Sequence, residues 1–320
     1  MSIVLDGTTG ITSPAETVTG QFSSGSTFAN KNRIINGGMV IDQRNAGASV
    51  TLSNSGFVYG VDRWAGVTGL ASSSTITIQR VTIGSNGFQY GTRILRGSGS
   101  YVSFVTIIQE PESLNTSDLA GQTITVSFWA RKGSTSTATT PYVQLISGTG
   151  TDQGIAGANA GSWTGWVSVG ASVYTPTTTL TQYTASFTVP SNSTELALAF
   201  VISSYTGTGS ANDYIDITGV QLEKGSVATS FDYRPYGTEL SLCQRYYEVS
   251  VFNNYGGYFT TANYTGASWQ YKVTKRVSPT VTLASGSSTL NNGNSDGVCV
   301  FNLINGTAVV FSGSTASAEL

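Results

Sequence analysis

The chain has 320 residues, only 10% of them charged, and its formal net charge is −2. Its 38 Gly and its 11% aromatic residues are typical of many short strands joined by tight turns. The length allows about two domains. No run of Lys or Arg occurs, so the sequence lacks the basic patch expected of a protein that binds nucleic acid or an anionic membrane.

Histidine is absent from the sequence, which removes the commonest general base near neutral pH and the commonest transition-metal ligand. Catalytic arrangements of the Ser-His or Cys-His kind are therefore excluded. Two cysteines, Cys243 and Cys299, cannot build a disulfide framework and indicate assembly in a reducing cytoplasm; a single disulfide between them is the less favoured alternative. With no signal-peptide pattern after Met1 and no long apolar run, we expect a soluble, non-exported protein without membrane insertion.

Residues 1–33 form an arm rich in Gly, Ser and Thr. Its apolar residues Ile3, Val4, Leu5 and Ile11 flank an Asp-Gly pair, which predicts a small hairpin. The rest of the arm has too little apolar surface to fold alone, so its order would come from a partner. The alternative is a disordered leader.

Between residues 34 and 235, strand patterns recur at short intervals. Many strands without long helices predict an antiparallel β-sandwich. The clearest patterns lie at 75–81, 123–131, 183–189, 196–202 and 214–217.

Alternation within 123–131 separates two faces of one strand. One face carries Ile124, Val126 and Phe128, while the other carries Trp129 and Arg131 among hydroxyl residues. Trp stacks on the apolar face of a sugar ring and Arg donates to its hydroxyls, so this second face is a candidate glycan site. The alternative is that Trp129 packs under a loop or against a neighbouring subunit. Trp64 is expected in the core.

A further aromatic group, Trp163, Trp166 and Tyr174, lies beside glycines. This pattern predicts a surface loop, where large aromatic side chains often make contacts. The contacted molecule is either a glycan or another protein chain.

The clearest pair of carboxylates is Glu110 and Glu112, on either side of a proline. Two carboxylates can serve glycoside hydrolysis, but residues beside Pro and Ser are ordinarily turn residues, and we favour that interpretation. No metal motif occurs, and we expect no cofactor. A structural calcium, without a supporting motif, is the alternative for the carboxylates Asp62, Asp213, Asp216 and Glu223.

After the sandwich, residues 236–247 are expected to form a short linker helix, and residues 248–320 a small C-terminal β-domain. A domain of about seventy residues is close to the size at which a single core is only marginally stable, and oligomerisation is one way to add stability. Tyr258 and Trp269, with Tyr255 and Tyr264, make an aromatic, weakly charged surface candidate in this domain.

Three stretches resemble known families. The stretch ITGVQLEKGSVATSFDYRPYGTELSLCQRYY at 217–247 resembles a linker of bacteriophage tail and fibre proteins, which follows a jelly roll similar to carbohydrate-binding modules. The opening IVLDGTTGI at 3–11 resembles the start of many phage tail proteins. The order of TVSFWARKG, YTASFTVP and YIDITGVQLEKG resembles the jelly roll of CenC-type carbohydrate-binding modules.

These resemblances imply a non-enzymatic phage virion protein, a tail fibre or receptor-binding subunit that is assembled in the host cytoplasm. They imply a homotrimer that is joined to other virion proteins by its N-terminal arm and adsorbs to host-surface polysaccharide. A capsid decoration or adaptor protein is the first alternative, and a glycan depolymerase the less favoured second. The candidate receptor-binding residues are Trp129, Arg131, Trp163, Trp166, Tyr174, Tyr258 and Trp269.

Overall fold

The structure is a computed structural model. It describes residues 31–54, 56–69, 75–97, 99, 104–250, 269–282, 294–296 and 313–320, together with the backbone of strands at 4–6, 10–12, 258–259, 264–268, 289–291 and 299–304.

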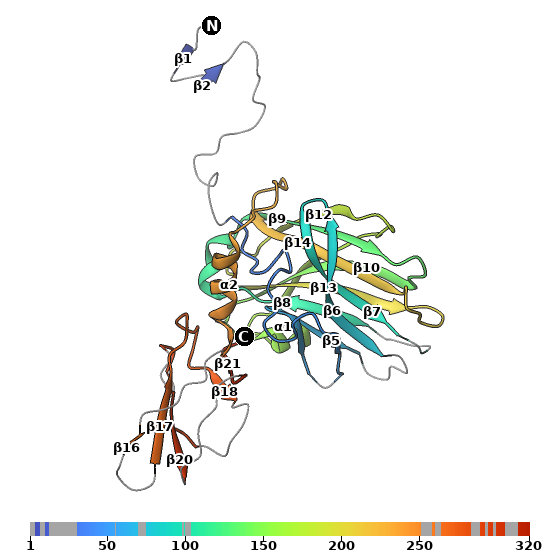
Figure 1. The fold of residues 1–320 in the computed structure, drawn as a ribbon. Helices are drawn as coiled ribbons and strands as arrows, with labels where there is room; N and C mark the ends of the chain where they lie inside the picture. The colour runs from blue at the N-terminus through green and yellow to red at the C-terminus, as the bar shows by residue number, and fades with distance from the viewer. Residues whose placement is uncertain are drawn as a thin grey trace.

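Two antiparallel sheets of six strands form the body of the molecule (Figure 1). Sheet 1 has the order β12-β9-β14-β7-β6-β3, with β3 Val50–Thr51, β6 Ile76–Ser85, β7 Phe88–Arg96, β9 Thr123–Lys132, β12 Thr181–Thr188 and β14 Tyr214–Lys224. Sheet 2 has the order β11-β10-β13-β8-β5-β4, with β4 Val58–Val61, β5 Trp64–Thr68, β8 Val105–Gln109, β10 Ala138–Gly148, β11 Val167–Val173 and β13 Glu195–Tyr205.

The chain crosses repeatedly between the two sheets. From β8 it passes to β9 in the other sheet and returns to β10 and β11, and from β12 it crosses to β13 and back to β14. This connectivity is that of a jelly-roll sandwich, in which strands that follow one another in sequence lie in opposite sheets. The predicted all-β jelly-roll fold is therefore confirmed.

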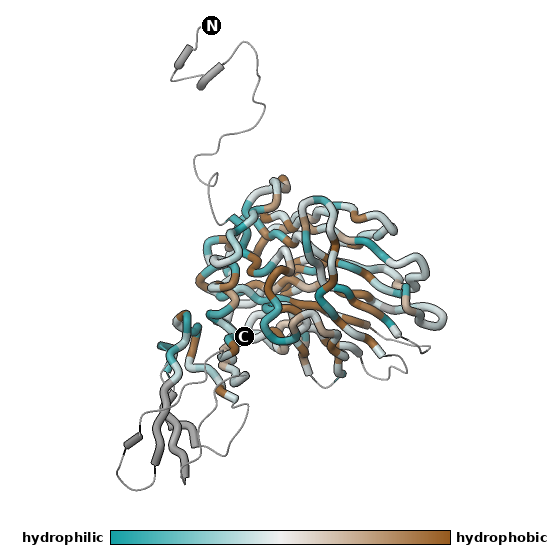
Figure 2. Tube along the Cα trace, in the orientation of Figure 1, coloured by the Kyte–Doolittle hydropathy of each residue, from teal (hydrophilic) through white to brown (hydrophobic). Residues whose placement is uncertain are grey.

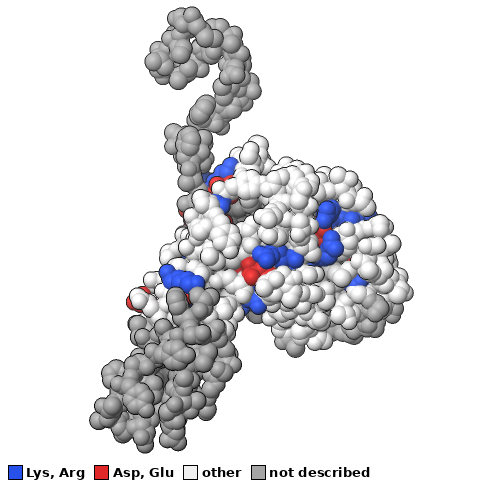
Figure 3. All heavy atoms as spheres, in the orientation of Figure 1, with Lys and Arg blue, Asp and Glu red and all other residues white. Residues whose placement is uncertain are grey.

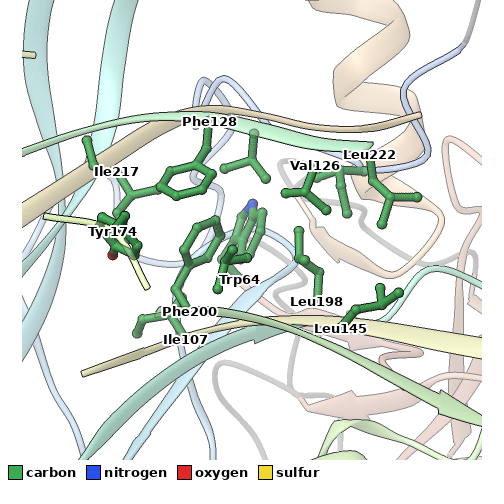
Figure 4. Close-up of a cluster of buried hydrophobic side chains, with 14 of the residues drawn as sticks. Trp64, Ile107, Val126, Phe128, Leu145, Tyr174, Leu198, Phe200, Ile217 and Leu222 are labelled. Atoms are coloured by element: carbon green, nitrogen blue, oxygen red, sulfur yellow. The ribbon is translucent and has the colours of Figure 1, made fainter. Parts of the chain in front are cut away.

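The core lies between the two sheets. Phe128 of sheet 1 meets Phe200 of sheet 2 edge to face, with ring centroids 4.9 Å apart, and Trp64 lies 5.9 Å from Phe200 (Figure 4). Trp64 is buried, as predicted. Along β9 the apolar residues Ile124, Val126 and Phe128 all face this core, so the predicted alternation is also confirmed. Apolar segments concentrate in the strands of the sandwich (Figure 2).

The helix expected at 236–247 is α2, Tyr236–Gln244. Its Cys243 is buried and free, and it packs with Ile35, Ile41 and Tyr246. Two small sheets follow. One has the order β15-β21-β18, with β15 Tyr247–Val249, β18 Thr280–Thr282 and β21 Thr315–Ser317; the other has the order β16-β17-β20-β19, with β16 Tyr258–Phe259, β17 Tyr264–Trp269, β19 Thr289–Asn291 and β20 Cys299–Ile304.

The C-terminal segment is tied to the sandwich by buried and partly buried ion pairs, which we call the polar junction: Arg63 and Arg44 with Glu319, Arg245 with Glu112, and Arg276 with Asp152. The end of the chain accordingly lies beside the sandwich in Figure 1. Elsewhere on the face seen in Figure 3, charged side chains are few and stand in small groups. The scarce charges of this chain are thus used largely for internal contacts.

The expected N-terminal hairpin is present as β1 Val4–Asp6 and β2 Gly10–Thr12, which pair antiparallel with Leu5 opposite Ile11. Ile3 lies outside the described residues. Among the helices that the structure describes, none combines the length and the apolar character needed to cross a bilayer.

Candidate ligand-binding surface

A bulge in β14 sets the position of an aromatic ring on the outer face of sheet 1. The register of β14 against β9 shifts between Thr218 and Gln221, and Gly219 within the bulge has φ +60°. A Cβ added at Gly219 would lie only 2.4 Å from the ring of Phe88. Glycine is therefore required twice here, by its backbone conformation and by the close approach of the ring.

Phe88 is the centre of an outer aromatic cluster made of Phe88, Trp129, Phe231 and Tyr233. Its ring centroid lies 6.1 Å from Trp129, 5.1 Å from Phe231 and 5.7 Å from Tyr233, on which it stacks. Phe231 and Tyr233 belong to the segment after β14, which folds back over the sheet. Tyr233 is 58% exposed, so the cluster ends in an accessible tyrosine.

A cleft of about 480 Å³ opens beside this cluster. We call it the linker cleft, and it is lined by Val40, Arg80, Gln89, Tyr90, Arg234 and Tyr236. The strands β6 and β7 supply three of these residues, the segment leading into α2 supplies Arg234, and the first residue of α2 is Tyr236. Tyr236 is 64% exposed.

The two arginines of the linker cleft are held in place by the protein. Arg80 lies 4.6 Å from the centre of the Tyr90 ring and donates to the Val40 carbonyl at 2.8 Å. Arg234 donates to the carbonyls of Asn32 and Ile34 and pairs with Glu239 at 3.3 Å. Its Nε is buried and has no partner within the protein.

The electrostatic balance of the linker cleft is close to neutral. Glu239 compensates Arg234, and the Asp42 carboxylate lies 3.9 Å from Arg80. The cleft thus offers aromatic faces and N–H donors without a strong net charge. That combination suits an uncharged ligand with an apolar face and many hydroxyl groups.

The structure places Trp129 and Arg131 on the outer face of sheet 1, as predicted from the alternation. Trp129 is half-buried in the outer aromatic cluster, which agrees with the alternative that it packs under a loop. Arg131 donates to Asp216 at 2.9 Å, and Arg93 binds the same carboxylate at 2.7 and 2.9 Å. Arg131 therefore takes part in a cross-strand ion pair rather than being a free donor.

The prediction of an exposed aromatic loop is wrong for Trp163 and Tyr174. Trp163 is buried and donates to the Gly154 carbonyl at 2.8 Å, at the start of the unpredicted helix α1, Ile155–Ala160. Tyr174 is buried in the core, where its ring meets Phe128 edge to face at 4.9 Å. Trp166 is partly buried and donates to the Ala158 carbonyl at 2.8 Å. Gly-rich sequence here makes a close packing site for indole rings.

The predicted exposure of Trp269 is also wrong. Trp269 is buried, and its ring meets that of Tyr271 edge to face at 5.1 Å. The side chain of Tyr258 lies outside the described residues, although its backbone belongs to β16. Tyr255 also lies outside them.

Glu110 and Glu112 precede a turn, in which the Asn115 N–H donates to the Glu112 carbonyl at 2.8 Å, but both side chains are buried, unlike those of most turn residues. Glu112 binds Arg245 at 2.7 and 3.1 Å. Burial, together with the nearby Glu195, raises the pKa of the Glu110 carboxyl group to about 8, although the Gly154 backbone and the charge of Arg63 act to lower it. The two side chains thus differ in environment, and neither lines the linker cleft.

The carboxylates considered for calcium serve protein partners. Asp213 pairs with Arg96 at 2.7 Å, and Asp216 pairs with Arg93 and Arg131. Asp62 accepts from Gln43, and Glu223 accepts from Thr229. Within the described ranges, no group of three or more Cys, Asp or Glu side chains is arranged to hold a metal ion.

Sequence reasoning missed Tyr90, Tyr233, Tyr236 and the two arginines of the cleft. The signal available was the run Tyr-Arg-Pro-Tyr at 233–236, an aromatic-rich and charged segment in a loop, which was interpreted only as a linker. The partners of this run lie near residues 40 and 80–90, and only the fold brings them together.

No protein-family model matches the sequence, and no curated protein matches it significantly. Among solved structures, a tailspike protein 4 domain of bacteriophage CBA120 is 14% identical, with a TM-score of 0.36 over 61% of this chain and 22% of that chain. A CBM4 structure is 18% identical, with a TM-score of 0.32 over 59% of this chain and 98% of that one. A xylan-binding CBM22 domain is 13% identical, with a TM-score of 0.33 over 58% and 100%. At these low values, the function has to be argued from the residues of this chain.

Proposed function

We propose that this protein is a phage virion adhesin that binds host-surface polysaccharide without cleaving it, and that the linker cleft is its sugar site. The observation that carries this proposal is the pairing of the exposed Tyr236 with fixed N–H donors in the linker cleft.

Tyr236 supplies an aromatic face on which the C–H side of a pyranose can stack, and Arg80, Gln89 and Arg234 supply donors to its hydroxyls. Tyr233, exposed beside the linker cleft, extends the aromatic surface toward a neighbouring sugar unit. Because the arginine charges are compensated, we propose neutral sugar units as the ligand. One stacked tyrosine contributes on the order of 1 kcal/mol, which makes binding by a single copy weak.

The absence of cleavage is part of the proposal. Glycoside hydrolysis requires two carboxyl groups that flank the scissile bond, and the residues that line the linker cleft include no carboxylate. Glu110 is buried elsewhere with its pKa raised to about 8. Release of reducing ends from a bound polysaccharide would instead support the depolymerase alternative.

The virion location rests on the resemblance of 3–11 and 217–247 to phage tail proteins. We propose that the arm at 1–33, with Val4, Leu5 and Ile11, joins other virion proteins, and that the chain is assembled in the host cytoplasm as a homotrimer. Particles produced with a chain that lacks 1–33 should then lack the subunit. Full occupancy of the subunit in such particles would contradict this attachment.

The sugar site is tested by Tyr236→Ala with Leu114→Ala as the matched control, because Leu114 is 86% exposed and does not line the linker cleft. Binding of the full chain is measured by calorimetry against a panel of purified bacterial surface polysaccharides, neutral and acidic, with thermal melting to verify folding. We expect Tyr236→Ala to weaken binding about fivefold and Leu114→Ala to leave it unchanged. A wild-type chain that binds none of the panel would overturn the proposed function, and unchanged affinity in a folded Tyr236→Ala variant would overturn the site.

A further inference from the structure

The sandwich has two long edge strands on one side. β11 ends sheet 2, and β12 ends sheet 1. The two strands lie close together, because a Cβ added at Gly170 of β11 would be 3.1 Å from the ring of Phe187 in β12. Each strand has one neighbour in its sheet, β10 and β9 respectively, so the outer side of each has no strand partner among the described residues.

This edge carries no charge. The segment 153–194, which contains both strands, has no Asp, Glu, Lys or Arg. Val167 and Val173 of β11 are exposed by 44% and 61%. Soluble proteins ordinarily protect a long edge strand with Lys, Pro, a bulge or a covering loop, because its unpaired N–H and C=O groups pair readily with another strand.

β11 itself has a register shift against β10, between Leu145 and Ile146, whereas β12 pairs with β9 in continuous register over eight residues. The opposite edges of the same two sheets are shorter or are held by side chains. At the far edge of sheet 1, β3 is only two residues long. At the far edge of sheet 2, β4 has a register shift between Tyr59 and Val61, and the Asn45 side chain donates to the carbonyls of Tyr59 and Gly60 at 2.9 and 2.8 Å. The β11–β12 edge differs from these edges in strand length, because β11 has seven residues and β12 has eight.

We propose that the β11–β12 edge is the surface through which a second copy of this chain associates, by pairing of edge strands. A second copy fits because it brings an equally uncharged edge, so no charge is buried without a partner and no like charges meet. The net charge of −2 adds little repulsion between copies. Association of identical chains is also the commonest route to a closed assembly.

This proposal goes beyond the sugar site and does not depend on it. In sheet 1, β12 lies at one edge, whereas β6 and β7, which line the linker cleft, lie toward the other. Pairing through β11 and β12 therefore leaves the linker cleft open in every copy. Several weak sites held in one assembly bind a polymer more tightly than one site does.

The test introduces a charge on the edge and an equal charge elsewhere. Val173→Lys places an ammonium on β11, and Leu114→Lys is the matched control, since Leu114 is 86% exposed and lies in the short segment Ser113–Asn115, outside both edge strands. The mass of the full chain is measured by light scattering and sedimentation over a range of concentrations. We expect the wild type and Leu114→Lys to form assemblies of two or more chains. We expect the Val173→Lys assembly to dissociate already at concentrations at least about tenfold higher than those at which the wild type dissociates.

A wild-type chain that is monomeric throughout, an unchanged Val173→Lys assembly, or equal weakening by both variants would overturn the proposal. Hydrogen exchange of the wild type provides a measurement that does not depend on the folding of a variant. Amides of 167–173 should exchange more slowly in the assembled than in the diluted protein, whereas protection that does not change with concentration would contradict strand pairing.

Discussion

The core of the sandwich and the polar junction hold the chain together by opposite means. The core joins two sheets through apolar and aromatic side chains such as Trp64, Phe128 and Phe200. The polar junction joins the C-terminal segment to the sandwich through arginines and carboxylates, of which Arg63 and Glu319 are nearly as buried, whereas the Arg245 side chain is 36% exposed. Apolar contacts tolerate small shifts of position, whereas a buried ion pair is stabilising only when both partners are in place. The core therefore sets most of the stability, and the polar junction sets how the C-terminal segment docks.

The largest expected effect is in the core. Trp64→Ala removes a fully buried indole that packs against Phe200, and it should lower the free energy of unfolding by about 3–5 kcal/mol. Chemical denaturation followed by circular dichroism measures this change. Trp64→Phe keeps most of the volume and should cost clearly less. Equal losses in the two variants would mean that the indole hydrogen bond to Asn36, rather than packing, dominates.

The next effect is at the polar junction. Glu319→Ala leaves the guanidinium groups of Arg63 and Arg44 without their shared carboxylate, and should cost about 3 kcal/mol, because a buried charge loses its partner. Hydrogen exchange should show the loss around 315–320 before it affects the core strands. Glu319→Gln, which retains an acceptor, should cost less. If Glu319→Ala instead speeds hydrogen exchange equally in the core strands and around 315–320, the polar junction and the core do not act as separate stabilising units.

A pH-dependent effect is expected at Glu110, which faces Glu195, Asp152 and Arg63. Its pKa of about 8 in the folded protein lies above the ordinary value of 4.5, so the unfolded chain loses this proton first as the pH rises. The contribution of protonated Glu110 to the free energy of unfolding is complete below pH 4.5, falls between pH 4.5 and pH 8, and stays low above pH 8. The slope is at most about 1.4 kcal/mol per pH unit. Glu110→Gln should flatten the curve of melting temperature against pH. The prediction is refuted if the stability of the wild type rises between pH 5 and pH 8 and that of Glu110→Gln rises equally.

The smallest effect is expected at an exposed ion pair. Arg33 binds Asp118 at 2.7 Å, but the Asp118 side chain is about half exposed. Asp118→Ala should cost less than about 1 kcal/mol, because water and salt screen the pair. Denaturation at low and high salt measures this, and the difference between Asp118→Ala and wild type should shrink further at high salt. If Asp118→Ala lowers the free energy of unfolding as much as Glu319→Ala does, burial does not determine how much an ion pair contributes to stability.

Several features followed from the sequence alone. Alternation along 123–131 predicted which side chains of β9 face the core, since successive residues of a strand point to opposite faces. Short strand patterns without long helices predicted the antiparallel sandwich, and the apolar residues around Asp6 predicted the pairing of β1 with β2. Each of these properties depends on neighbours along the chain.

Exposure and the binding surface were decided only by the tertiary structure. Trp163 and Tyr174 have the local sequence of a surface loop, yet α1 covers the first and the closing sheets bury the second. Glu110 has the sequence of a turn residue, but its environment comes from Glu195 and Arg63, distant along the chain. The linker cleft likewise joins Val40, Arg80 and Tyr236, because crossing connections bring separate segments together. Periodicity determines the face of a strand, but what covers that face depends on packing between segments far apart in sequence.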